Sequence, residues 1–259
     1  MRARAARDPR LIRRPVAAPI LLACVALFAT SLASVAQQAP HNLDDYLREH
    51  WWGVRKDDVA ALFDASDVPR LEELLASETP YCGAVVSMLV ILGDERAVDA
   101  LIAFVQTPYS DPSLASVYES ARGGAITGLG QLARRIGSER ALTYLIDGLT
   151  PDVWAKRNVR GVATWTKDYQ EYDTLLGEYA IHGLAYSGDP RAGEALKSLQ
   201  RSPTPEQARL RKGLDKTLEL WLETYDQVAA TGLDPAEAYS ELQRRRAAEP
   251  AAEGAEAGK

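Results

Sequence analysis

Hydrophobic residues recur at helical spacing along most of the chain and predict an all-helical protein. Three segments repeat an apolar residue every three or four positions, the period of one helix face. These sets are Val98, Leu101, Ile102 and Val105; Leu142, Leu145, Ile146 and Leu149; and Ala195, Leu196 and Leu199. Each segment is therefore expected to be an amphipathic helix that buries one side.

A short phrase precedes each of these segments and predicts a tight turn. It occurs at Leu92–Ala97, Ile136–Ala141 and Ser187–Ala192, and each copy has a glycine followed by Asp or Ser. Glycine readily takes the left-handed conformation that ends a helix, and Asp or Ser caps the next helix. We therefore expect left-handed turns at Gly93, Gly137 and Gly188. A weaker copy stands at Ser66–Leu71.

Arginines and glycines recur in register with these turns. A cation in the first turn of a helix is unfavourable toward the helix dipole, so each arginine is expected to have a partner. The partner would be carbonyls of the preceding helix or an acid of the adjacent repeat; the alternative is a solvated side chain. The arginines are Arg70, Arg96, Arg140 and Arg191.

Glycines inside the first helix of each pair predict that neighbouring helices approach closely. The alternative is a loosely helical segment. The glycines are Gly123, Gly124, Gly128, Gly130 and Gly183.

The repeated phrase resembles the short HEAT-like repeats first associated with phycobilin lyases. The likeness rests on the turn sequence and on the matching helix segments Ala125–Gly130 and Ala180–Ala185. It implies a short α-solenoid of helix pairs over 57–202 that binds other macromolecules. Long connections after Gln106 and Thr150 depart from the pattern, and no lyase-specific residue carries over.

The ends of the repeat region are expected to be helical caps. We predict an N-terminal capping helix within 37–56 and C-terminal capping helices over 203–246. The first of the latter is a long helix from the capping-box sequence Thr204–Gln207 to Gly232. Residues 247–259 are Ala-, Glu- and Gly-rich and predict a disordered tail.

Residues 1–36 have the layout of a secretory signal peptide. Six arginines precede an apolar stretch from Val16 to Ala33, and Ser34–Ala36 supplies small residues before the expected cut after Ala36. The protein is thus expected to be exported, periplasmic or extracellular. An uncleaved membrane anchor and a lipoprotein site at Cys24 are the alternatives.

The insertion at 151–172 is basic and aromatic, which suits a recognition loop. Trp, Tyr and Arg are enriched in binding hot spots. The alternative is a flap packed on the repeats, with its cations solvated. The candidate partner-binding residues are Trp154, Lys156, Arg157, Arg160, Trp165, Lys167 and Tyr169.

Composition argues against catalysis and nucleic-acid binding. The chain has 259 residues, with two cysteines and three histidines. Its net charge is −6, so it repels nucleic acid overall. The sequence contains no hydrolase, P-loop, dinucleotide-binding or metalloprotease motif, and no catalytic, metal or cofactor site is predicted. Cys82 and His182 suit core positions. We expect a non-catalytic scaffold for a protein partner; the alternatives are an enzyme or accessory subunit with a pocket under 152–172, or an envelope-anchored structural protein that retains its N-terminal segment.

Overall fold

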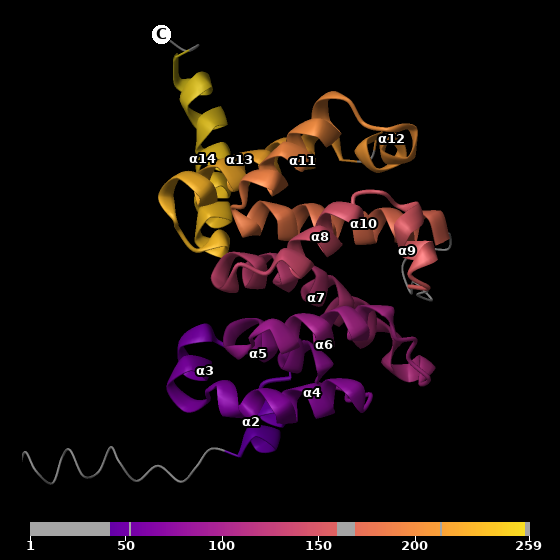
Figure 1. Ribbon diagram of the computed structural model, residues 1–259. Coiled ribbons are helices and arrows are strands. Elements are labelled where there is room, and N and C mark those ends of the chain that lie inside the picture. The colour runs from indigo at the N-terminus through magenta and orange to yellow at the C-terminus, as the bar shows by residue number, and fades with distance from the viewer. Residues whose placement is uncertain (1–41, 52, 160–168, 213, 257–259) are drawn as a thin grey trace, which may run out of the picture. The chain divides into compact units, whose positions relative to one another are not determined.

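The described part of the chain is all-α, as predicted. The structure, a computed structural model, describes residues 42–51, 53–159, 169–212 and 214–256, and these contain no strand (Figure 1). All described helices belong to one compact unit, residues 43–259. They are α2 Leu43–Glu49, α3 Lys56–Leu62, η1 Ala65–Asp67, α4 Val68–Ala76, α5 Cys82–Leu92, α6 Glu95–Gln106, η2 Pro112–Leu114, α7 Ala115–Ile136, α8 Glu139–Asp147, α9 Asp152–Lys156, α10 Tyr169–Ser187, α11 Pro190–Arg201, α12 Pro205–Lys212, α13 Asp215–Thr231 and α14 Pro235–Glu256.

Helices within this unit pack in consecutive pairs. The first helices α5, α7, α10 and α13 contact one another in chain order, and α6, α8 and α11 follow as the second helices of three pairs. Figure 1 shows the pairs following one another from α4 to α11. This order is compatible with an α-solenoid.

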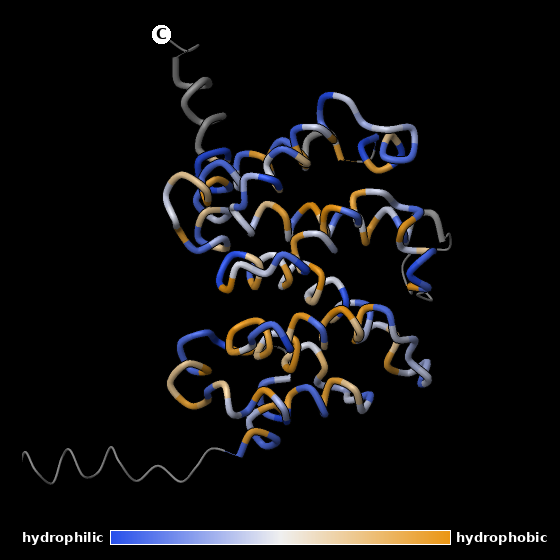
Figure 2. Tube along the Cα trace, in the orientation of Figure 1, coloured by the Kyte–Doolittle hydropathy of each residue, from blue (hydrophilic) through white to orange (hydrophobic). Residues whose placement is uncertain are grey.

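The core lies along the first helices and the inner faces of the second ones. Helix α5 is apolar around most of its circumference because α3, α4, α6 and α7 contact it from several sides; Figure 2 colours it largely orange. Met88 and Leu89 of α5 are fully buried. The second helices α6, α8 and α11 bury one stripe each, as their sequence period predicts.

Two of the three predicted left-handed turns are confirmed. Gly137 has φ +69° and Gly188 has φ +61°, which are conformations that L side chains rarely adopt. Gly93 differs, because it is extended with φ −68° and ψ 161°. A Cβ there would collide with Ala97 Cβ and Leu89 O, so lack of space rather than backbone handedness requires this glycine.

The predicted helix caps are present after all three turns. Asp94 accepts a hydrogen bond from the backbone N–H of Arg96 at 2.9 Å, and Asp189 accepts one from Arg191 at 2.8 Å. The hydroxyl of Ser138 accepts one from Ala141 N–H at 3.2 Å. These bonds satisfy N–H groups that the first helical turn leaves unpaired.

Glycines allow α7 and α10 to touch through their backbones, as the sequence predicts. A Cβ on Gly130 would lie 2.6 Å from the Cα of Gly183 and still closer to its carbonyl. On the other side of α7, the Val90 side chain of α5 occupies the space over Gly128. Tyr179 of α10 likewise lies against Gly123, where a Cβ would be 2.5 Å from the ring.

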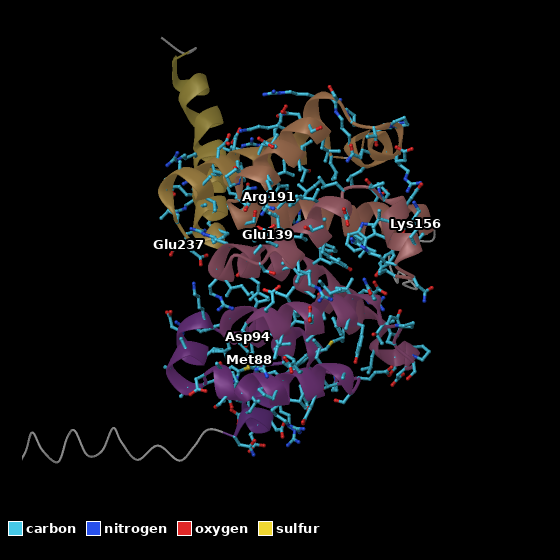
Figure 3. All side chains as sticks on the ribbon, viewed as in Figure 1. Met88, Asp94, Glu139, Lys156, Arg191 and Glu237 are labelled. Carbon is cyan, nitrogen blue, oxygen red and sulfur yellow. The ribbon has the colours of Figure 1, made fainter. Side chains whose placement is uncertain are left out.

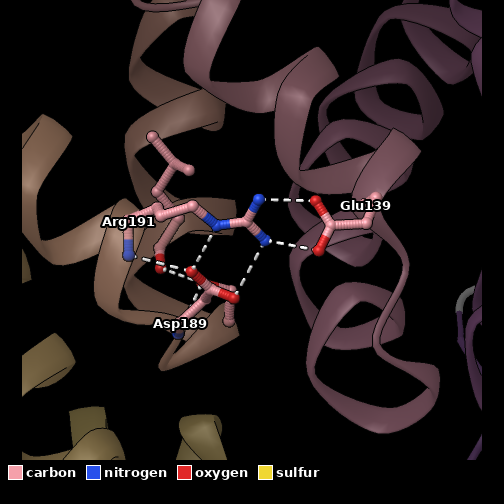
Figure 4. A network of polar contacts seen from close by, with 5 residues as sticks. Glu139, Asp189 and Arg191 are labelled. Carbon is pink, nitrogen blue, oxygen red and sulfur yellow. Dashed lines mark hydrogen bonds and ion pairs between the residues drawn. The ribbon is translucent and has the colours of Figure 1, made fainter.

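Two of the four first-turn arginines have the predicted partner, an acid in the adjacent repeat. Arg140 of α8 pairs with Asp99 of α6 at 2.7 Å. Arg191 of α11 pairs with Glu139 of α8 (Figure 4). The other two arginines differ from each other: Arg70 pairs with Asp44 of α2 at 3.2 Å, whereas Arg96 pairs with its own cap Asp94 at 3.5 Å.

The capping elements differ in part from prediction. The Thr204–Gln207 capping box forms, with bonds of 3.1 and 3.3 Å. The prediction of one long helix from this box to Gly232 is wrong, because two helices stand there. Leu214 instead separates α12 from α13 with φ −128°, outside helical geometry. Helix α14 runs to Glu256, into the predicted tail. At the other end α2 stops at Glu49, so Trp51, which falls within the predicted capping segment 37–56, lies after the observed helix.

The predicted signal peptide lies outside the described residues. Among the helices that the structure does describe, none combines the length and the apolar character needed to cross a bilayer.

Candidate functional site

Trp154, a predicted partner-binding residue, is a core residue of α9. Its side chain has no exposed surface, and its indole N–H donates to the carbonyl of Gly148 at 3.0 Å. The ring meets Tyr144 of α8 edge-on, with centroids 5.8 Å apart. The prediction of an exposed anchor is therefore wrong for Trp154, because α9 folds back on α8 and α10; the packed-flap alternative describes this residue.

Arg157 follows α9 and is held against α8. Its guanidinium lies 3.8 Å from the centroid of the Tyr144 ring and donates to the Tyr144 carbonyl at 3.2 Å. Asp147 is 3.4 Å away, and 14% of the Arg157 side chain remains exposed. Burial lowers the pKa of Arg157, which the nearby Tyr144 and Asp147 partly oppose. Stacking and hydrogen bonding thus give Arg157 a packing role.

The other predicted loop residues are divided between exposed and undescribed positions. Lys156 is exposed, and Figure 3 places it on α9 at the outer edge of the described helices. Arg160, Trp165 and Lys167 lie outside the described residues. Tyr169 begins α10, and only its backbone is described. Partner binding by these five residues stays a prediction.

A groove over α5 and α7 is a larger feature of the described surface. It has a volume of about 890 Å³ and is bounded by α5, α7, the Trp51–Lys56 segment and the start of α14. Small residues recur along α7 every three or four positions and therefore share one face. The α7 residues of this kind are Ser116, Ser120, Gly124, Thr127 and Gly128, and those of α5 are Gly83 and Ser87.

The floor of the groove is open at two of its glycines, Gly83 and Gly124. A Cβ on Gly83 would meet nothing within 4 Å, and one on Gly124 would meet only Val86, at 3.8 Å. Gly130 differs from these two glycines, because the backbone of Gly183 fills the space beside it. A backbone or side chain from outside the described unit can thus approach α5 and α7 closely.

Residues from both ends of the described unit border the groove. Lys56, the first residue of α3, and Asp234 before α14 form an ion pair at 3.1 Å, and both line the groove. Trp51 lies beside them with 44% of its surface exposed, which makes it one of the largest exposed apolar groups described. Trp51 supplies apolar contact area next to a floor of small polar residues.

The chemistry within reach of the groove suits contact better than catalysis. It offers the hydroxyls of Ser87, Ser116, Ser120 and Thr127, and the Gln131 amide. In the described ranges, no group of three or more His, Cys, Asp or Glu side chains could hold a metal ion.

Burial makes Cys82 and His182 unsuited to act as a nucleophile or a base. Burial raises the pKa of the Cys82 thiol to about 12, so it stays protonated at neutral pH. Burial also lowers the pKa of His182 to about 4. Cys82 occupies the core position expected from the sequence, whereas His182 is half-buried.

Sequence reasoning about the insertion missed the groove, although a signal was present. Ser116, Ser120, Gly124 and Thr127 repeat at helical spacing, and Gly83 and Ser87 do the same on α5. A stripe of small residues that continues past the helix contacts indicates a face kept open.

Comparisons with protein-family models, with curated proteins and with solved structures found no match for this chain.

Proposed function

We propose that the protein is a non-catalytic HEAT-like repeat scaffold that acts outside the cytoplasm and binds a segment of a partner protein in the groove over α5 and α7. The repeated turn phrase, its caps and the consecutive packing of helix pairs support the repeat assignment. The expected export segment supports the compartment. A concave surface made by stacked helix pairs is the part of such repeats that binds partners.

The observation that carries the proposal is the open, exposed surface of α7 at Ser120 and Gly124. Gly128, Gly130 and Gly123 are each occupied by a neighbouring group. Gly124 lies between them and Ser120 one turn earlier on the same helix; both are exposed and face the groove. Close packing inside the described unit therefore does not account for their small size, whereas a partner backbone lying along α7 does.

Trp51 would then act as an apolar anchor beside the groove. Partly exposed tryptophans are frequent hot spots because they bury a large area at a small entropic cost. Lys156, Arg160, Trp165, Lys167 and Tyr169 stay part of the proposal as a second contact region. Their cations would meet an acidic or polar part of the same partner.

Site-specific cross-linking followed by reconstitution tests this proposal. A photo-reactive amino acid replaces Ser120 in the groove or, as a control, the exposed Ser198 on α11. The protein that cross-links from Ser120 and not from Ser198 is purified and titrated against the parent chain and two variants. Gly124→Leu fills the groove and should weaken binding at least about tenfold, the effect of losing about 1.4 kcal/mol. Ser198→Leu should bind as the parent does. Equal cross-linking at both positions, or unchanged binding by Gly124→Leu, contradicts a binding groove.

The alternative is an enzyme or enzyme accessory subunit that uses a cleft next to the 152–172 segment. One observation favours it: a cleft of about 620 Å³ lies between α6, α8 and Arg157, with Asp147 and Glu139 in its wall. Activity that is lost in Asp147→Asn while the helical circular dichroism signal is unchanged would support the enzyme. Because Asp147 is exposed, this variant is expected to fold.

A further inference from the structure

A second pocket, separate from the groove, lies between α4, α6 and the start of α7. Its volume is about 580 Å³, which is in the range of small-molecule sites. No residue of the groove lines it, so the two sites are chemically independent. The apolar wall consists of Leu75, Ala76, Ala100, Ala103, Phe104 and Pro108.

Two polar atoms in this wall are shielded from solvent and have no partner among the described residues. One is the Oε1 oxygen of Glu72 on α4, and the other is the hydroxyl of Tyr118 on α7. Tyr118 is only 3% exposed. An unpaired buried carboxylate oxygen is unfavourable by several times the energy of an ordinary hydrogen bond, so it calls for a cation or a hydrogen-bond donor.

Other acids at the pocket already have partners. Glu78 accepts hydrogen bonds from the backbone N–H and the hydroxyl of Ser110, at 2.8 and 2.7 Å. Asp99 is paired with Arg140 at 2.7 Å. Glu72 differs from both, because no ion pair links it to any Lys, Arg or His nitrogen in the described part of the chain.

Arg96 is a cation in the pocket wall, but it does not neutralise Glu72. It pairs instead with Asp94, its own helix cap, at 3.5 Å. Three acids and one cation thus line the pocket, and the unpartnered charge among them is negative. The site therefore favours a positively charged ligand.

We propose that this pocket binds a primary alkylammonium group, with Glu72 as its counter-ion and the Tyr118 hydroxyl as a hydrogen-bond acceptor. An ammonium carries three N–H donors, enough to satisfy both orphaned oxygens. Its alkyl stem matches the apolar wall, where Ala100 and Ala103 leave room and Phe104 and Pro108 give contact area. The aromatic faces of Phe104 and Tyr118 also attract a cation.

A metal ion fits this pocket less well than an organic cation. Hard divalent cations take six or more oxygen ligands, whereas the wall here is mainly apolar. Within the described ranges, no cluster of three or more metal-binding side chains occurs.

The alkylammonium group that the pocket binds can come from two sources, a free amine or the lysine side chain of a peptide.

Ligand-observed NMR with the full chain tests the site. The probe is n-hexylammonium, with 1-hexanol as the neutral control of equal length; acetyl-Leu-Lys-Leu-amide and its Nζ-acetylated form test the lysine source. Hexylammonium should bind and hexanol should bind at least about tenfold more weakly. Binding of hexylammonium alone identifies a free amine as the ligand, and binding of the lysine peptide but not its acetylated form identifies a lysine side chain. If neither cation binds more tightly than its neutral counterpart, the proposal is overturned.

Three variants place the binding in this pocket. Glu72→Gln keeps the shape and removes the charge, so it should weaken hexylammonium binding about tenfold or more. Tyr118→Phe should weaken it less, because the lost partner is neutral. Glu73→Gln is the matched control, since Glu73 is the next residue on α4 but is exposed and paired with Arg70. Equal affinity of the Glu72→Gln and Glu73→Gln variants would place the ligand elsewhere.

Discussion

Arg191 and Glu139 face each other across two helix pairs, with both terminal guanidinium nitrogens bonded to the two carboxylate oxygens. The bond from Nη2 to Oε1 measures 2.8 Å, and Figures 3 and 4 show Arg191 next to Glu139. Asp189, the cap of α11, accepts a bond from Nε of the same guanidinium at 3.2 Å. One arginine therefore connects the first turn of its own helix to the first turn of α8.

We predict that this ion pair makes stability depend on pH in a defined direction. The Arg191 guanidinium holds the pKa of Glu139 below its ordinary value. A carboxyl whose pKa is lowered by folding stabilises the protein above its unfolded pKa, near 4.3, and loses that effect as pH falls through the folded pKa. Glu139→Gln should therefore unfold at lower urea than the parent at pH 7, with the difference narrowing at acidic pH and in high salt.

The control for this prediction is Glu194→Gln, an exposed glutamate on α11. Its urea midpoint should follow that of the parent at every pH. Because both Glu139 and Arg191 are largely exposed, the whole effect is expected to be small. Parallel pH profiles for the two variants would contradict a role for the pair.

We predict opposite effects for two glycine-to-alanine substitutions six residues apart on α7. Gly130→Ala would place a methyl group in the Gly183 backbone and should lower the free energy of unfolding by about 1–3 kcal/mol or more. Gly124→Ala faces open space and should raise it by about 0.5–1 kcal/mol, because alanine is the better helix former. Urea denaturation measures both. A destabilised Gly124→Ala would mean that the groove is not open.

We predict that Trp154 stabilises the fold and Lys156 does not. Trp154→Ala removes a fully buried ring and should lower the free energy of unfolding by about 3–5 kcal/mol. Lys156→Ala, on the exposed side of the same short helix, should change it by no more than about 0.5 kcal/mol. Thermal unfolding followed by circular dichroism distinguishes them, and equal melting temperatures would contradict the packing of α9.

We predict that His182 destabilises the protein as pH falls. Its ring lies against Trp221, tilted by 36° with centroids 4.0 Å apart, and burial lowers its pKa to about 4. The unfolded chain, with a pKa near 6.5, binds the proton more tightly, so stability is lost between about pH 6.5 and 4. The loss is roughly 3 kcal/mol in total, at 1.36 kcal/mol per pKa unit.

Glu178 opposes part of the destabilisation that His182 causes at low pH. Its carboxylate lies 3.8 Å from His182 Nε2, and burial raises its pKa, so it favours the folded state as pH falls. His182→Phe should flatten the stability profile between pH 6.5 and 4. A His182→Phe profile as steep as that of the parent would assign the pH dependence to other groups.

Local chemistry predicted the features that depend on a few neighbouring residues. The caps at Asp94, Ser138 and Asp189 and the left-handed Gly137 and Gly188 follow from what one turn requires. Gly93 looks the same in sequence, yet its backbone is extended, and the space between Leu89 and Ala97 has no room for a Cβ. That space depends on how the next helix packs, which a turn motif does not encode.

Features that depend on distant contacts were not predictable in the same way. An aromatic and basic segment can cover either a partner or its own domain, and only the position of Tyr144 and Gly148 decides that Trp154 is buried. The break at Leu214 is similar, because the apolar stripe from Leu210 to Val228 continues across it in sequence. The ligand pocket combines Glu72 and Tyr118, which are far apart in the chain.

The backbone contact between Gly130 and Gly183 also determines how the described unit can deform. Long side chains between two helices can change rotamer and let the helices slide, whereas two touching backbones have no such freedom. Helices α7 and α10 therefore act as one stiff block. Bending has to occur where side chains separate the helices, such as at Val90 between α5 and α7. Because that interface forms the groove floor, flexing there would widen or narrow the groove without disturbing the stiff block.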